Sequence, residues 1–367
     1  MYLELVEVAN DLEEYGLIDA ERRRQLIAYF WEKQQDYSAD DAVYYALQQS
    51  MCDVIRVVGS HGFDEEHITA NLTGSLTANL SWFARAYRRW EGQETLPHFQ
   101  WVHQTKHSEA RSGIDLGILA RIPGGDAVRA WRLLVVQAKL GEPDALKISV
   151  DHITNSTRKV PLTPAALQIF RAAAHATGDF VLTKELYDTH TAACVPFETG
   201  DVRYQLEAIL RTDLRGRKLA NSNRNWCFYA GWFPASLPLA VDVRTLAGDC
   251  VARFNDRPRE HWFKKDALDF TNLMHETIFA EETPYGLVLS EEQVGEVVDD
   301  LLVTAPDIRL LLASADGELD YNLGTKKRLL VSGSLIPLQL VHPTVAPPTV
   351  STTIDPSDSS TDTTLGY

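Results

Sequence analysis

The sequence predicts an α/β protein with a mixed central β-sheet flanked by helices. Up to about residue 97, apolar residues recur three and four positions apart, which is the period of an amphipathic helix. Between 97 and 140 the pattern changes to alternating and aliphatic runs typical of strands, and from 140 to 235 helical and strand patterns alternate. The 367 residues, of which 45% are hydrophobic, suffice for a sizeable core.

The first 60 residues predict a helical N-terminal arm. "DAERRRQLIAYFWEKQQ" begins with an Asp in the N-cap position, and "SADDAVYYALQQSMCDVIRVVG" has Ser38 as its cap and Gly59 as its terminator. A third helix, "FDEEHITANLTGSLTANLSWFARAYRRW", begins near Asp64 and carries Glu65 and Glu66 in its first turn. The helix dipole favours acidic side chains there, so the two glutamates have a structural explanation as well as a functional one.

Strands are predicted next: "FQWVHQTK", then "SGIDLGILARI", then the turn "PGGD" and "AWRLLVVQAKL". Alternate residues of a strand point to the same face, so Gln137 and Lys139 project together from the end of an aliphatic strand. Asp115 lies between Ile114 and Leu116, where a carboxylate is costly to bury unless something binds it. If the turn pairs the two strands, Asp115, Gln137 and Lys139 converge at one end of the sheet.

The later chain is predicted in three parts. Up to residue 235, "TPAALQIFRAAAHAT" and "DVRYQLEAILRTDL" are helical and "DFVLTKEL" and "NWCFYAGWF" are strands, which makes 61–235 the sheet domain. Residues 236–343 look mainly helical, with helices at 266–280 and 290–314 and a last strand pair at 326–341. The tail 344–367 is rich in Pro, Ser, Thr and Asp, and we expect it to be disordered.

The order of these features is informative: a helix with Glu66 (or Glu65), a strand with Asp115, a strand ending in "QAK" with Gln137 and Lys139, and then a further helix. This order resembles the PD-(D/E)XK, or restriction-endonuclease-like, nuclease superfamily over roughly residues 61–235. The resemblance implies a restriction-endonuclease-like fold and hydrolysis of phosphodiester bonds, most often of DNA, with Mg²⁺ or Mn²⁺ as cofactor. Because many members serve DNA restriction, repair or anti-phage defence, it also implies a prokaryotic defence context.

Phosphodiester hydrolysis needs a nucleophilic water and stabilisation of the charge on the phosphoryl oxygens, and a hard cation with oxygen ligands supplies both. The resemblance implies that Asp115, Gln137, Glu66 and the backbone carbonyl of Ala138 hold this cation. Lys139 would act on the attacking water and offset phosphate charge. Gln137 stands where the family usually has a carboxylate, so the affinity for the cation should fall and Glu66 becomes more important.

Other interpretations stay open. Gln137 and Lys139 also suit an ordinary polar strand end, and the chain also suits a catalytically weak or inactive subunit that binds a partner in a multi-protein complex. Two weaker features are Gln205, on the helix after the sheet strands, and a basic segment that is suited to phosphate contacts but equally to a solvated loop. The basic segment comprises Arg215, Arg217, Lys218 and Arg224.

Composition restricts the function classes. The net charge of −16 is uneven: residues 61–235 hold 20 Lys and Arg against 18 Asp and Glu, so a nucleic-acid partner is permitted there. The four cysteines form no CxxC pair, which argues against structural zinc and disulfides and, with no secretion signal or long apolar run, leads us to expect a cytoplasmic protein without membrane contact. No phosphate loop, dinucleotide fingerprint, nucleophile elbow or HExxH motif is present. The choice between DNA and RNA, and the oligomeric state, stay open.

Overall fold

The structure is a computed structural model of the chain. It describes residues 9–16, 19–25, 39–61, 65–91, 97–104, 114–142, 145–150, 152–154, 169–171, 173, 203–234, 236–254, 260–264, 267–305, 308–315, 323–326 and 329–334. The predicted strand 179–186 and the predicted tail 344–367 lie outside these residues.

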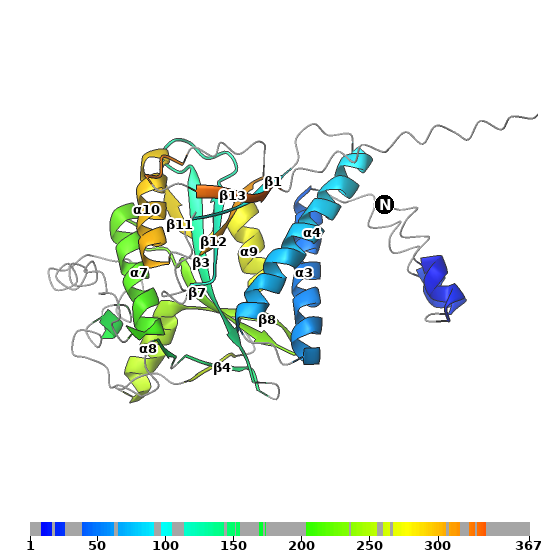
Figure 1. Cartoon of the computed structure of the whole chain (residues 1–367), viewed down its shortest axis with the longest axis horizontal. Coiled ribbons are helices and arrows are strands. Elements are labelled where there is room, and N and C mark those ends of the chain that lie inside the picture. Colours follow the sequence, from blue (N-terminus) through cyan, green and yellow to red (C-terminus); the bar gives the residue numbers. More distant parts are fainter. Residues whose placement is uncertain are drawn as a thin grey trace, which may run out of the picture. The chain divides into compact units, whose positions relative to one another are not determined.

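A mixed β-sheet forms the centre of the described part of the chain (Figure 1). Its strands follow the order β10 (Leu268–Asp269), β8 (Ser236–Asp242), β7 (Cys227–Phe233), β3 (Trp131–Leu140), β2 (Leu116–Arg121), β12 (Arg309–Ser314), β1 (His98–Gln104) and β13 (Leu329–Ser334), and β11 (Leu287–Leu289) pairs with the start of β3. The pairs β3–β7 and β2–β12 are parallel, whereas the other pairs are antiparallel. The predicted α/β class with a mixed central sheet is confirmed.

Helices cover both faces of the sheet (Figure 1). On one face, α7 (Gln205–Ala220), α8 (Val243–Phe254) and α10 (Glu291–Thr304) share an apolar cluster with Leu133 and Val135 of β3. On the other face, α3 (Ala39–His61), α4 (Glu65–Glu91) and α9 (Phe270–Phe279) share a second cluster with Leu134 and Val136. The alternation along β3 therefore sorts its side chains between two cores, as a central strand requires.

Short strand pairs lie beside the main sheet. β4 (Lys147–Ser149) pairs with β9 (Glu260–Trp262), and β5 (Ile153–Thr154) pairs with β6 (Arg203–Tyr204), which leads directly into α7. A bridge between Gly141 and Ile148 joins the end of β3 to β4. The β4–β9 ribbon thus continues outward from the end of β3 at which the sequence predicts the site.

Two regions differ from their predicted roles. The helix α3, in the predicted N-terminal arm, packs in the same core as α4 and α9, so this segment belongs to the central fold. Residues 236–343, predicted to be mainly helical, supply β8, β10, β11, β12 and β13 to the central sheet. The expected boundary at 235 falls between β7 and β8, which are hydrogen-bonded neighbours.

The strand β12 separates β1 from β2, although these two strands are consecutive in the predicted order. The sequence pattern extended the helix from 290 to 314, whereas α10 ends at Thr304 and β12 begins at Arg309. Pro306 follows α10, and proline cannot continue a helix. Gly117 permits the close parallel approach of β12, because a Cβ atom there would lie 2.3 Å from Cδ2 of Leu310.

Candidate functional site

Asp115 and Gln137 meet across the β2–β3 pair. Leu116 lies opposite Val136, so Asp115, immediately before β2, falls opposite Gln137. The Gln137 Nε2 atom donates to Oδ2 of Asp115 at 2.7 Å, and the backbone N–H of Ala138 donates to the same oxygen at 2.8 Å. Asp115 is half-buried and Gln137 is 2% exposed. The structure therefore brings this part of the predicted constellation together.

Lys139 projects to the same face of β3 as Gln137. Its neighbour in β7 is Gly231, where an added Cβ would meet Phe263 and Ile148 on the face covered by α7 and α8. Lys139 is only 2% exposed, which is rare for a lysine. A buried ammonium two residues from a buried amide gives the end of β3 a polarity that core packing alone does not require.

The helix glutamates stand apart from this arrangement. The buried side chains of α4, such as Ile68 and Leu72, pack in the cluster that contains Ala138, on the face opposite to Gln137 and Lys139. Glu65 and Glu66 begin α4, but their side chains lie outside the described residues. Because α4 covers the opposite face, a carboxylate on its first turn would have to reach around the end of the sheet.

Some, but not all, of the predicted ligand groups at this site are placed so that they could bind a divalent cation. Gln137 Oε1 is buried and has no hydrogen-bond partner, which is costly for an amide oxygen unless a donor or cation binds it. With the Asp115 carboxylate it offers two oxygen ligands, and Mg²⁺ often takes only one or two protein ligands because it retains waters. The Ala138 carbonyl, by contrast, already accepts from Gln137 Nε2 at 2.9 Å. Among the described residues no group of three or more His, Cys, Asp or Glu side chains is placed to hold a metal.

Gln205 is buried, whereas its helical pattern also suited a surface position. It opens α7, its backbone N–H donates to the carbonyl of His152, and it is 6% exposed. Its Oε1 is a second buried amide oxygen without a partner, on a helix that packs against the Gln137 face of the sheet. Burial strengthens its candidacy as a residue that supports the site.

No family model, curated protein or solved structure matches this chain.

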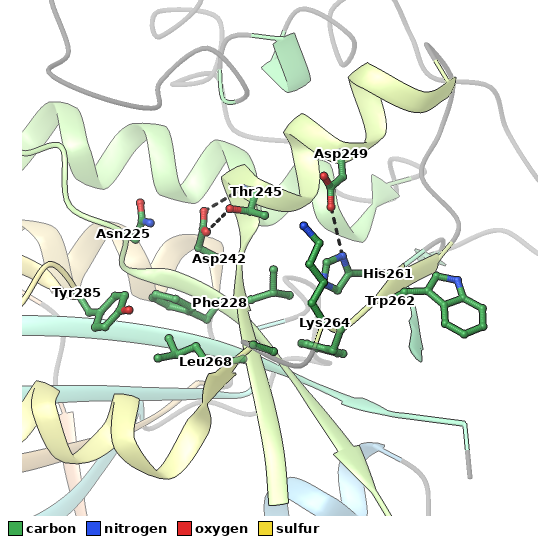
Figure 2. Close-up of a pocket in the computed structure, with 14 residues that line it drawn as sticks. Asn225, Phe228, Asp242, Thr245, Asp249, His261, Trp262, Lys264, Leu268 and Tyr285 are labelled. Carbon is green, nitrogen blue, oxygen red and sulfur yellow. Dashed lines mark hydrogen bonds and ion pairs between the residues drawn. The ribbon is translucent and has the colours of Figure 1, made fainter. Parts of the chain in front are cut away.

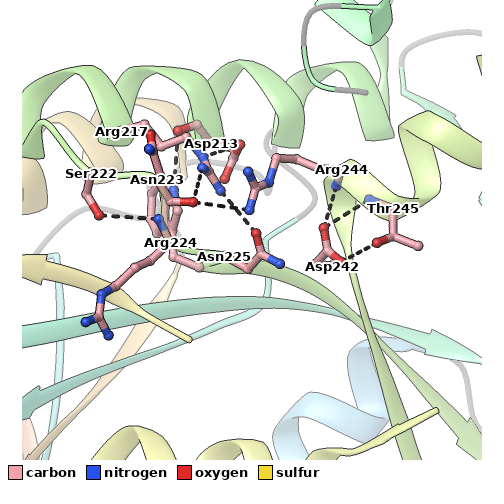
Figure 3. Close-up of polar contacts among 10 residues, drawn as sticks. Asp213, Arg217, Ser222, Asn223, Arg224, Asn225, Asp242, Arg244 and Thr245 are labelled. Carbon is pink, nitrogen blue, oxygen red and sulfur yellow. Dashed lines mark hydrogen bonds and ion pairs between the residues drawn. The ribbon is translucent and has the colours of Figure 1, made fainter. Parts of the chain in front are cut away.

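The arginines of the predicted basic segment bind partners within the chain, and Figure 3 shows the contacts of Arg217. Arg217 is 6% exposed, contacts Asp213 at 2.8 Å and donates to the Asn223 carbonyl at 2.7 Å. Arg215 forms an ion pair with Asp300 of α10, and Arg224 donates to the carbonyl of Thr283. These guanidinium groups join α7, α10 and the loops around the sheet, and Lys218 is the exposed member of the segment.

The sequence pattern did not reveal a pocket of about 340 Å³ beside β8 (Figure 2). Its apolar wall includes Phe228, Val241 and Leu268, and its polar residues include Asn225 and Asp242. No motif links these residues, because they come from β7, β8, β10 and the turns beside them. Only pairing of β7, β8 and β10 makes them neighbours.

No helix in the described part of the chain is long and apolar enough to cross a membrane.

Proposed function

We propose that the chain is a metal-dependent nuclease of the PD-(D/E)XK type that hydrolyses phosphodiester bonds, with DNA as the expected substrate. One observation carries the proposal: Asp115, Gln137 and Lys139 gather at one end of the paired strands β2 and β3, with Asp115 and Gln137 in direct contact. A carboxylate and an amide oxygen can bind a hard cation, and an ammonium can stabilise the negative charge of a phosphate.

The chain order of the elements also supports this proposal. Helix α4, strands β1, β2 and β3, helix α7 and strand β7 occur in this order, with the short strands β4, β5 and β6 between β3 and α7. Strands β2 and β3 are antiparallel, and β7 is parallel to β3. The resemblance noted in the sequence rests on this helix–strand–strand–helix order. The insertion of β12 between β1 and β2 is an addition to it.

Each side chain has a definable role in such a site. Asp115 would hold the cation, which supplies Lewis acidity and offsets negative charge when bound. The Ala138 N–H and Gln137 Nε2 hold Oδ2 of Asp115 in place, and Gln137 Oε1 is available as a further ligand. Lys139 would orient the attacking water and balance the phosphate charge from a position with little exposure to solvent, where its charge acts strongly.

We expect the full chain to cut plasmid DNA, single-stranded DNA or RNA with Mg²⁺ or Mn²⁺ but not with EDTA. Asp115→Ala and Lys139→Ala should each lower the rate by about 100-fold or more, the usual loss when a charge-stabilising group is removed. Gel assays of the three substrates, with circular dichroism of each variant, measure this.

The β2–β3 hairpin offers a matched control. Asp126, in its turn, accepts hydrogen bonds from the backbone of Val128 and Arg129, and Asp126→Asn should cut at the wild-type rate. Lys326→Met, at an exposed lysine, controls for Lys139. Equal cleavage by Asp115→Ala and Asp126→Asn would refute the proposed site.

A second candidate is a catalytically inactive subunit that binds a partner protein in a multi-protein defence complex. Hydrogen bonds within the site favour this candidate. Gln137 Nε2 donates both to Asp115 and to the Ala138 carbonyl, so oxygens that would bind a metal already accept hydrogen bonds from within the chain. Titration calorimetry with Mn²⁺ separates the two candidates. Binding that Asp115→Ala abolishes supports the nuclease, and no heat in the wild type supports the subunit.

A further inference from the structure

The pocket beside β8 lies along the same sheet as the proposed site. Val241, in its wall, pairs with Tyr229 of β7, which in turn pairs with Gln137 of β3. Neighbouring strands are about 4.8 Å apart, so Val241 and Gln137 are separated by roughly 10 Å. A stacked nucleic-acid strand rises about 3.4 Å per nucleotide, so this separation corresponds to about three nucleotides.

The lining of the pocket suits a flat, partly polar ligand. Phe228 and Tyr285 form an edge-to-face pair with ring centroids 5.9 Å apart, and Leu268 extends the apolar wall (Figure 2). The Asn225 Oδ1 atom accepts from Nη2 of Arg217 at 3.5 Å (Figure 3). The Nδ2 donor of Asn225 therefore points away from Arg217. Asp242 provides acceptor oxygens: its carboxylate caps α8 by accepting from the backbone N–H groups of Arg244 and Thr245 and from the Thr245 hydroxyl, and a carboxylate has about four acceptor positions.

The charged side chains that line the pocket determine which part of a nucleotide it can bind. The pocket holds the carboxylates of Asp242 and Asp249, and Asp249 lies 3.7 Å from Nδ1 of His261 (Figure 2). A phosphate would be repelled by two carboxylates, whereas the N–H groups of a nucleobase are donors that a carboxylate accepts. Lys264, an exposed lysine of the lining, offsets part of this negative charge and suits the phosphate attached to the bound base.

An exposed indole marks one end of the pocket. Trp262 is 56% exposed, although large apolar side chains are usually buried, and Figure 2 shows its ring extending outward beyond His261. Trp262 ends β9 and pairs with Lys147 of β4, whose Nζ lies 5.0 Å from the ring centroid. The β4–β9 ribbon therefore connects the end of β3 with an aromatic surface on which a base can stack.

We propose that this pocket and its Trp262 rim bind a nucleobase of a single strand whose backbone lies at the Asp115 site. The proposal rests on the proposed nuclease function for the source of the strand. It assigns a substrate class: a strand with unpaired bases, because an unpaired base enters a pocket without the free-energy cost of unpairing and unstacking that a base in a duplex incurs. The size of the pocket, at the lower end of the range for ligand sites, suits one base.

The test is binding of the full chain to a fluorescent single-stranded oligonucleotide in EDTA, where nothing is cut. Trp262→Ala should weaken binding by about 5- to 150-fold, the effect of losing one base–aromatic stack. Ala267→Phe, which fills the pocket, should also weaken it. Tyr15→Ala is the matched control, since Tyr15 is an aromatic side chain with 77% exposure outside the pocket, and it should bind as the wild type does.

The outcomes separate this proposal from the nuclease proposal. A chain that cuts nothing with any metal, yet loses oligonucleotide affinity in Trp262→Ala and Ala267→Phe, would refute the nuclease and support the base pocket. Folded variants that bind like the wild type, or a wild type that binds no single strand, would overturn the base pocket. Free adenosine or cytidine is the second probe: if Trp262→Ala weakens only nucleoside binding, the base comes from a free nucleoside and not from the strand, which also overturns the proposal.

Discussion

Replacing Gln137 with Glu is expected to lower the free energy of unfolding by about 2–4 kcal/mol in EDTA, and Mg²⁺ or Mn²⁺ should restore much of this loss. Gln137 Nε2 donates both to Asp115 and to the Ala138 carbonyl, whereas an ionised glutamate has no donor. The substitution therefore places two carboxylates together at a position that is 2% exposed. A cation relieves this repulsion if the site holds one.

Urea denaturation of both proteins, with EDTA and with saturating metal, measures the effect. Gln100→Glu is a matched control, because Gln100 is also a buried glutamine of the central sheet, 3% exposed, with an unpartnered Oε1. Its loss of stability should be the same with and without metal. If metal leaves Gln137→Glu as unstable as EDTA does, Asp115 and residue 137 do not form a cation site, and the inactive-subunit candidate gains support. If metal restores stability, the same variant should also cut at lower Mg²⁺ than the wild type.

Replacing Arg132 with Met should lower the free energy of unfolding by about 3–5 kcal/mol. Arg132 is fully buried, and its guanidinium donates to four backbone carbonyls at the end of α9, those of Glu276, Thr277, Ala280 and Glu281, at 2.7–3.1 Å. The Glu276 carbonyl also accepts the backbone N–H of Ala280 at 3.1 Å, but no further helical turn follows to supply donors to the other three, so methionine would remove a donor that they need. Burial, and then the charges of Arg224 and Arg129, lower the pKa of Arg132 to about 10, so it still carries its charge at pH 7.

Thermal and urea denaturation check this second prediction. Arg129→Met is the control, because the Arg129 side chain is 45% exposed and its contact with Glu282 spans 3.7 Å, so it should cost less than about 1 kcal/mol. Gly286→Ala should also lower the free energy of unfolding, because it would displace the Arg132 side chain: an added Cβ would lie 2.3 Å from Cγ of Arg132. In addition, Gly286 has φ +79°, a backbone conformation that favours glycine. If Arg132→Met lowers the free energy of unfolding by less than about 1 kcal/mol, the prediction is wrong, and water takes the place of the guanidinium as donor to these carbonyls.

Several elements were predictable because their signals are local. The repeat of apolar residues every three or four positions predicted α3 and α4, and the turn "PGGD" between two apolar runs predicted the β2–β3 hairpin. The hairpin alone was enough to expect Asp115 near Gln137, because side chains opposite each other on paired strands share a face. That contact is confirmed, whereas metal binding and catalysis at this site are still predictions.

The misassigned parts depend on distant contacts. The aliphatic run of β12 suited the end of a helix equally well, and only its parallel pairing with β2 makes it a strand. Arg132 gave no sign in the sequence of its role, because its carbonyl partners are more than 140 residues away. The sequence of the basic segment suits phosphate contacts, but in the folded chain Arg215 and Arg217 form ion pairs with Asp300 and Asp213.

The sequence by itself determined the α/β class, the β2–β3 hairpin and the shared face of Gln137 and Lys139, because helix period, strand period and turn chemistry act over a few residues. The tertiary structure decided that α4 covers the opposite face, that β12 enters the sheet, and that Asn225, Asp242 and Trp262 line one pocket. These features depend on which surfaces bury each other, and burial is a property of the whole folded chain that no short segment encodes.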